Sequence, residues 1–241
     1  MKYCIYFSFL LICISINGQS NVTVPALEKD SFFESKLTGE SFFENKQYLG
    51  DQYFNNDWAI SDILLSSGEM VKNKNLKYNG LFDEVIWMNS SNYGKYKLDK
   101  SFISEFWLKI APGSTLHFKR IHVDGPNESH PFDIFVQVKV EGKVSLYIHH
   151  KITITGEENL YVNNNLYYFN RIGKMPVYYI KLITNRYVKM SGIRLSSFLK
   201  VFPEEKKEIT KLLKENHLKI KTENDLIKAI GLLNKQVFLE N

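Results

Sequence analysis

Alternation of apolar and polar residues with a period of two runs through most of the chain, from Trp58 to about Met190. β-branched and aromatic residues recur between short breaks of Gly, Asn and Asp, a pattern typical of consecutive antiparallel strands. The breaks are too short for the crossover helices that parallel strands require. We therefore predict a mainly β (α+β) fold over residues 57–196: an antiparallel meander sheet, as a sandwich or an open barrel.

The clearest hairpin in this region can be aligned by its apolar residues. Keeping both apolar sets on one face places Val140 opposite Val144, with a three-residue loop at 141–143. The same register puts Asp133 across from Lys151, a small favourable charge pair. Further strands of the same sheet are predicted at residues 84–88, 103–110, 115–123, 159–169 and 176–183.

The last part of the chain, residues 197–241, changes to a helical period. Pro203 suits a first helical position and Asn216 suits a helix end. Thr222 followed by Asp225 resembles a capping box that opens a second helix. The apolar stripes of these helices are Ile209, Leu212 and Leu213 in the first, and Leu226, Ala229, Ile230 and Leu233 in the second. We predict a C-terminal amphipathic α-helical hairpin packed on the β domain.

The N-terminus has the layout of a secretory signal. Residues 1–18 contain an early positive charge, an apolar run and then small or polar residues. The run is shorter than the ~20 apolar residues of a membrane-spanning helix, so we expect a signal peptide and a secreted or periplasmic protein with no transmembrane segment. Both cysteines, Cys4 and Cys13, lie within this signal, so the mature chain has no disulfide.

Residues 19–56 are polar and contain a short duplication. Ser31-Phe-Phe-Glu-Ser-Lys36 recurs as Ser41-Phe-Phe-Glu-Asn-Lys46. The Phe pairs suit either docking to a partner or packing against the domain, and we favour packing because single exposed apolar residues are ordinary. We expect this segment to be partly disordered.

Charge excludes one class of partner. The chain has 31 Lys and Arg against 26 Asp and Glu, well mixed along the sequence. A nucleic-acid-binding protein concentrates its basic residues on one face or in one block. We therefore expect no nucleic-acid partner.

Histidines and carboxylates offer two candidates for chemistry. His149 and His150 are neighbours on a strand and point to opposite faces, so they cannot bind one metal together, and we interpret His150 as a core histidine bonded to a backbone carbonyl. His122, Asp124, Glu128 and His130 are potential zinc ligands, but their spacing matches no metal motif and is typical of a turn.

No other motif in the sequence indicates catalysis or cofactor binding. A nucleophile elbow and a phosphate-binding glycine loop are both absent. Asp83 and Glu84, as neighbours on a strand, would face apart and cannot form a glycosidase pair with each other. We assign no catalytic, cofactor-binding or metal-ligating residue and expect no cofactor, although distant carboxylates could still meet in the fold.

Aromatic residues are a stronger feature than any of these. The strand aromatics are Trp87, Phe106, Trp107, Tyr147, Tyr161, Tyr167, Tyr168, Phe169, Tyr178 and Tyr179. They suit either a sheet core or an aromatic platform for a glycan or apolar ligand, and we favour a core for most of them because aromatic burial dominates core energetics. Tyr178 and Tyr179 face opposite ways, so we expect one of the two to be exposed.

Three segments support a resemblance: Tyr78-Asn-Gly-Leu-Phe-Asp-Glu-Val-Ile-Trp87, Val140-Glu-Gly-Lys-Val-Ser-Leu-Tyr-Ile-His149 and Phe198-Leu-Lys-Val-Phe-Pro-Glu-Glu-Lys-Lys207. Over about residues 55–235 the chain resembles a group of uncharacterised secreted proteins of Bacteroidota with a β-rich body and a helical tail. The resemblance implies a bacterial envelope or extracellular setting and no particular activity. Our leading hypothesis is a noncatalytic binding or structural module of the cell envelope, with an envelope protein or a glycan as its partner. The alternative is a hydrolase acting on an envelope or extracellular polymer.

Overall fold

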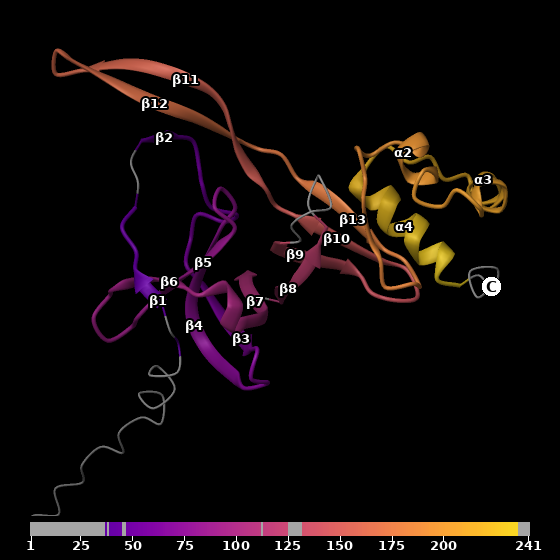
Figure 1. Ribbon diagram of the computed structural model, residues 1–241, viewed down its shortest axis with the longest axis horizontal. Helices are drawn as coiled ribbons and strands as arrows, with labels where there is room; N and C mark the ends of the chain where they lie inside the picture. Colours follow the sequence, from indigo (N-terminus) through magenta and orange to yellow (C-terminus); the bar gives the residue numbers. More distant parts are fainter. Residues whose placement is uncertain (1–36, 38, 45–46, 112, 125–131, 236–241) are drawn as a thin grey trace, which may run out of the picture.

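The computed structural model describes residues 37, 39–44, 47–111, 113–124 and 132–235. Within these residues the protein is mainly β, with a large open antiparallel sheet and three α-helices, the last of them at the C-terminal end (Figure 1). The predicted mainly β (α+β) class is therefore confirmed, with an open sheet. The predicted signal peptide at 1–18 lies outside the described residues.

The large sheet contains eleven strands that pair antiparallel throughout. Most chain neighbours are also sheet neighbours, as a meander requires. The order across the sheet is β1 (Gly39–Ser41), β6 (Lys95–Leu98), β5 (Glu84–Met88), β4 (Met70–Asn79), β3 (Ala59–Leu65), β7 (Ile103–Ala111), β8 (Ser114–Val123), β9 (Phe132–Val140), β10 (Ser145–His149), β13 (Val177–Lys181) and β14 (Tyr187–Lys189). A short 3₁₀ helix, η1 (Lys100–Phe102), joins β6 to β7.

A second sheet contains three strands, β11 (Ile152–Val162), β12 (Asn165–Lys174) and β2 (Tyr48–Leu49), with β2 parallel to β12. The prediction of one strand at 159–169, in the same sheet as the others, is wrong. The chain reverses there at Asn163 and Asn164, whose φ angles of 47° and 63° are those of a two-residue hairpin turn. Asn tolerates this left-handed backbone better than most residues. The alternation of apolar and polar residues does not take this turn preference into account.

The predicted register of the β9–β10 hairpin is also wrong. Val140 pairs with Leu146, and the register then shifts at a bulge so that Tyr147 pairs with Val138. A bulge adds one residue to a strand and reverses the facing of the residues beyond it, so Val140 and Val138 pack in different apolar clusters. Asp133 pairs with His122 of β8 rather than with Lys151, because β10 ends at His149.

One face of the large sheet carries two separate cores. The aromatic core, over the strands β3 to β9, is built on Tyr78, Phe106, Phe118 and Phe135 together with aliphatic residues of the same strands. The helical core, over β10 and β13, packs Leu146, Ile148 and Ile180 beneath the helices. The continuous register from Phe118 through Gln137 to Ile148 shows that the two cores occupy the same side of the sheet.

The helical layer consists of α2 (Leu195–Leu199), α3 (Lys206–Glu215) and α4 (Glu223–Leu233). The predicted capping box is confirmed at the start of α4, where the side chains of Thr222 and Asp225 each accept a backbone N–H of the other residue. α3 ends at Glu215 with Asn216 as its C-cap, as predicted, but it begins at Lys206, so the prediction of Pro203 as its first helical residue is wrong. None of the helices in the described part of the chain has the length and apolar character needed to cross a bilayer.

Tyr178 and Tyr179 do face opposite sides of β13, but both are buried at 7% exposure, so the prediction that one is exposed is wrong. Tyr178 packs in the helical core, and Tyr179 belongs to a third cluster with Ile134, Val136 and Tyr147 on the opposite face. The sheet is therefore buried on both sides at this point.

Two short strands lie within residues 19–56, where the sequence predicted partial disorder. β1 pairs with β6 at one edge of the large sheet, and β2 pairs with β12. The first copy of the Ser-Phe-Phe-Glu duplication lies outside the described residues. In the second copy Phe42 is half-buried and Phe43 is 85% exposed, so only one of its two rings packs against the domain.

Candidate functional site

A cavity of about 570 Å³ opens at one edge of the large sheet, between β1, β6, the β4–β5 turn and η1; we call it the edge pocket. A second hollow of about 360 Å³ shares part of its lining and continues past Phe42 and Phe43. The charged residues that line the edge pocket are Glu40, Glu84, Lys97, Asp99 and Lys100. Mixed charge of this kind beside aromatic rings suits a polar ligand with an apolar face.

Two phenylalanine rings stand at the edge pocket. Phe82, in the β4–β5 turn, is 47% exposed, and Phe102, in η1, is 54% exposed. Tyr48 of β2 meets Phe82 edge-on, with ring centroids 6.0 Å apart. The rings are therefore held at the mouth of a cavity instead of being buried in the aromatic core.

The β4–β5 turn that positions Phe82 has a local cause. The side-chain oxygen of Asn79 accepts the N–H of Leu81 at 3.0 Å, which fixes the start of the turn. Gly80 must be glycine, because a Cβ there would lie 2.4 Å from the carbonyl oxygen of His150. The turn is thus pressed against the end of β10.

Carboxylates in the edge pocket have opposite pKa shifts. Burial raises the pKa of Glu84 despite the opposing effect of Lys97, whose Nζ lies 3.7 Å from Glu84 Oε1 and 3.1 Å from Glu40 Oε2. Asp99 accepts the side-chain and backbone donors of Ser101 at 2.7 and 2.9 Å, and these hydrogen bonds lower the pKa of Asp99. Asp99 is thereby engaged as the cap of η1.

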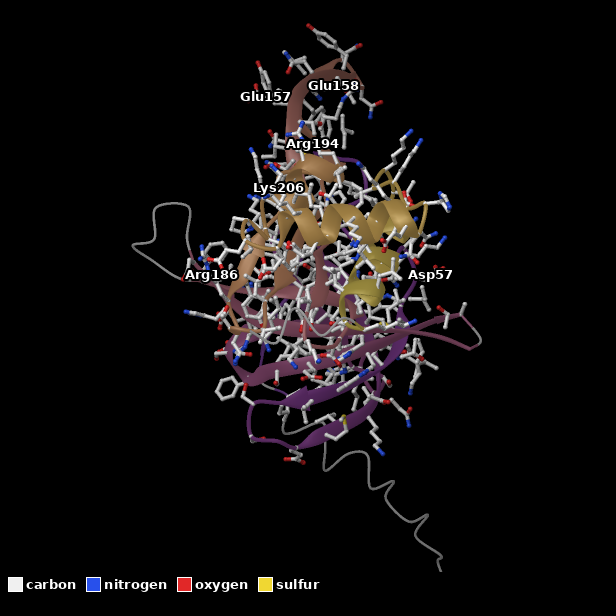
Figure 2. All side chains as sticks on the ribbon, turned by 90° about the vertical axis from the view of Figure 1, so that its right-hand side faces the viewer. Asp57, Glu157, Glu158, Arg186, Arg194 and Lys206 are labelled. Carbon is white, nitrogen blue, oxygen red and sulfur yellow. The ribbon has the colours of Figure 1, made fainter. Side chains whose placement is uncertain are left out.

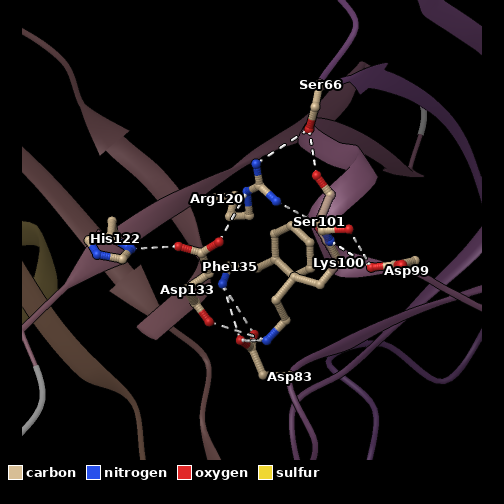
Figure 3. A network of polar contacts seen from close by, with 9 residues as sticks. All are labelled: Ser66, Asp83, Asp99, Lys100, Ser101, Arg120, His122, Asp133 and Phe135. Atoms are coloured by element: carbon tan, nitrogen blue, oxygen red, sulfur yellow. Dashed lines mark hydrogen bonds and ion pairs between the residues drawn. The ribbon is translucent and has the colours of Figure 1, made fainter. Parts of the chain in front are cut away.

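Behind the pocket wall lies a part-buried polar cluster centred on Asp83 (Figure 3). Lys100 reaches in from the pocket and donates to Asp83 Oδ2 at 2.6 Å, while the hydroxyl of Tyr78 donates to Oδ1 at 2.7 Å. Burial, followed by the negative charge of Asp83, raises the pKa of Tyr78. Asp83 has a left-handed backbone, with φ of 56°, and precedes β5, so it is a turn residue and not the strand residue that the sequence indicated.

Asp83 also completes the hydrogen bonding of β9. The backbone N–H of Phe135 lies beyond the end of β10 and donates to the Asp83 carboxylate at 3.2 and 3.3 Å. A buried N–H without an acceptor would be costly. Asp83 therefore joins the β4–β5 turn to η1 through Lys100 and to the middle of the sheet through Phe135. The linear sequence could not reveal this role, because these residues are far apart in it.

His149 lies beside Asp83, and His150 lies against Gln137 of β9. His149 is buried, and its Nε2 lies 3.7 Å from Asp83 Oδ1, too far for a hydrogen bond. Burial lowers the pKa of His149 although Asp83 opposes the shift. His150 bonds to the side chain of Gln137 at 2.7 Å, not to a backbone carbonyl as predicted, and burial lowers the pKa of His150 to about 3.

The four residues that were considered as zinc ligands from the sequence and interpreted as a turn are only partly described. His122 bonds to Asp133 at 2.9 Å, and Glu128 and His130 lie outside the described residues. Asp133 also meets Arg120 Nε at 3.7 Å, which extends the network drawn in Figure 3. In the part of the chain that the structure describes, no three His, Cys, Asp or Glu side chains gather closely enough to hold a metal ion.

The ten strand aromatics divide into three groups, of which one, Trp107 and Phe169, is half-buried. Trp87, Phe106, Tyr147, Tyr178 and Tyr179 are buried, as the core interpretation predicts. The exposed residues are Tyr161, Tyr167 and Tyr168, all on the β11–β12 hairpin.

Comparison of the chain with family models, with curated proteins and with solved structures gave no match. The resemblance to secreted proteins of Bacteroidota therefore stays a prediction.

Proposed function

We propose that this chain is a noncatalytic binding module of the bacterial cell envelope, and that it binds a glycan in the edge pocket. The observation that carries the proposal is the pair of exposed rings, Phe82 and Phe102, at a cavity lined with carboxylates and ammonium groups. A sugar ring offers an apolar C–H face to an aromatic ring, while its hydroxyls hydrogen-bond to charged side chains. The envelope setting rests on the predicted signal at 1–18 and on the resemblance.

The absence of catalysis in this proposal follows from how the charged groups are used. Asp99 caps η1, and Glu84 shares Lys97 with Glu40. Asp83 and His149, whose side chains are 13% and 9% exposed, do not line the pocket. The carboxylates that a reaction would need are already engaged in holding the edge of the sheet together.

Binding would be tested by titrating the full chain with neutral and acidic oligosaccharides from envelope polymers, using calorimetry. Phe82→Ala and Phe102→Ala should each weaken binding about fivefold, since an aromatic contact contributes roughly 1 kcal/mol beyond its burial. Ile60→Ala is the matched control, because Ile60 is also 54% exposed but lies on β3, away from the pocket. Binding that neither phenylalanine variant weakens would place the ligand elsewhere.

The second candidate, a hydrolase, is favoured by one observation: Glu84 and Asp99 line one pocket with pKa shifts in opposite directions, as acid and base partners do. Incubation with the same oligosaccharides, followed by assay of new reducing ends, separates the two functions. We expect binding without turnover. Turnover that Glu84→Gln abolishes would establish the hydrolase instead.

A further inference from the structure

The β11–β12 hairpin forms a long arm that extends from the body of the protein (Figure 1). Its ladder contains ten residue pairs, from Ile152–Lys174 to Val162–Asn165. β2 pairs only with Asn170 and Arg171. Beyond these residues no third strand accompanies the ribbon among the described residues. Figure 2 shows Glu157 and Glu158, which lie on the arm before its outer end, near the top of the view.

Large side chains at the end of this arm are exposed to solvent. Tyr161 is 77% exposed and Tyr168 is 71% exposed, and Leu166, directly across from Tyr161, is 39% exposed. Residues opposite each other in a ladder share a face, and so do residues two apart, so these three residues lie on one face. A two-stranded ribbon without a covering layer is marginally stable in water, and clustered exposed apolar side chains mark an interaction surface.

The end of the arm carries no charge. Residues 159–170 include no Lys, Arg, Asp, Glu or His, whereas the whole chain has a net charge of +5. A surface that binds a charged partner carries charged residues of the opposite sign around its aromatic face. An uncharged surface on a basic protein suits a second copy of the same chain, because identical copies can meet there without repulsion.

The outer edge of β11 is open in the described part of the chain, since β11 is the last strand of its sheet. In a two-residue hairpin the residues flanking the turn form a hydrogen-bonded pair, and the pattern then alternates. Residues 157, 159 and 161 consequently direct their backbone N–H and C=O groups away from β12. Such an edge is a template for another strand, and two identical edges pair antiparallel about a two-fold axis.

We propose that two copies of this chain associate through the ends of their arms, with the β11 strands paired antiparallel and centred on Leu160. This register places every glutamate opposite an uncharged residue, whereas a register centred on Glu157 or Glu158 would set like charges face to face. It also joins the exposed Tyr161, Leu166 and Tyr168 of both copies into one four-stranded face. The arm then becomes a dimerisation element, independent of any ligand in the edge pocket.

Sedimentation of the full chain between about 1 and 100 μM tests the association. We expect a monomer–dimer equilibrium that Tyr161→Glu combined with Tyr168→Glu shifts to monomer by at least a hundredfold in Kd. Ile60→Glu, at a site on β3 that is 54% exposed and outside the arm, should leave the equilibrium unchanged. A monomer at all concentrations, or a dimer that survives the double variant, would overturn the proposal. Tryptophan fluorescence of each variant shows that the body is folded, since all three tryptophans lie outside the arm.

A single cysteine tests the register. With Cys4→Ser and Cys13→Ser, the chain has no other thiol. Leu160→Cys should form a covalent dimer under mild oxidation, because paired residues on neighbouring strands bring Cβ atoms within about 4.5–5.5 Å, close to disulfide geometry. Ile60→Cys should remain monomeric on a reducing-agent-free gel. Equal crosslinking of both, or crosslinking of neither, contradicts the paired arms.

Discussion

The two cores on one face of the sheet are closed in different ways. Over β3 to β9 the strands and the β4–β5 turn enclose the aromatic core themselves, and the Asp83–Lys100 ion pair holds the turn in place. Over β10 and β13 the sheet is covered by helices, which pack aliphatic residues and Phe198 against Leu146 and Ile148. The part-buried hydrogen bond between Gln137 and His150 lies where the two cores adjoin. A single sheet can therefore cover one core with its own strands and turns, held by polar contacts, and cover a second core with a separate layer of helices.

Large deletions in each core show whether the two regions unfold as one unit. Phe118→Ala in the aromatic core and Phe198→Ala in the helical core should each cost about 4 kcal/mol, because both rings are fully buried. Trp87 lies in the aromatic core and reports on it by fluorescence, while Trp58 and Trp107 are half-buried in the same part of the sheet. The helical band in circular dichroism reports on the helices. We expect the two signals to change together in urea, since the register through Gln137 links both cores. Loss of the helical signal alone in Phe198→Ala would separate them.

Removing the charge of Asp83 tests whether polar contacts of the β4–β5 turn stabilise the aromatic core. Asp83→Asn keeps a residue that tolerates the φ of 56° but leaves Lys100 without its ion-pair partner. Breaking a fully buried pair costs ~3–5 kcal/mol, and because the Lys100 side chain is 30% exposed we expect about 2 kcal/mol.

A double-mutant cycle distinguishes the ion pair from other effects of this substitution. Adding Lys100→Met to Asp83→Asn should restore part of the lost free energy of unfolding, because the unpaired charge is then removed. Strictly additive losses in urea unfolding would show that Asp83 acts only through Tyr78 and the N–H of Phe135.

Acid should weaken the junction between the cores. The pKa of His150 is about 3 in the folded protein because of burial, compared with about 6.5 when the chain is unfolded. Between these values the unfolded state binds the extra proton, so stability is complete above pH 6.5 and falls as the pH drops toward 3. From pH 7 to pH 5 the loss should be about 2 kcal/mol.

Urea unfolding at pH 7 and pH 5 measures this loss. His150→Gln should make the dependence on pH shallower, and the lowered pKa of His149 accounts for part of what remains. A native protein whose stability is the same at both values would contradict the assignment of His150 as a buried neutral histidine.

Sequence patterns predicted the secondary-structure elements of both regions better than the contacts that join those elements. The strand at 84–88 and the capping box at Thr222 depend on local preferences and are confirmed. The β9–β10 register failed because a bulge changes facing without a mark in the apolar pattern. The edge pocket and the Asp83 cluster bring together residues from separate strands and turns. Alternation along one strand carries no information about contacts between distant residues.

Loss of the α4 cap should have the smallest effect on the free energy of unfolding. It also tests most directly whether the helices unfold together with the sheet. Thr222→Ala removes the acceptor for the N–H of Asp225 and should cost about 1 kcal/mol. Thr210→Ala on α3 is the control, since Thr210 is half-buried within a helix, its hydroxyl donates only to the backbone carbonyl of Lys206, and alanine is favourable there. If the cores unfold together, Thr222→Ala shifts the fluorescence and dichroism midpoints equally. A shift confined to the helical signal would mean that α4 detaches before the sheet unfolds, and the helical layer would then be a removable cover instead of part of one cooperative core.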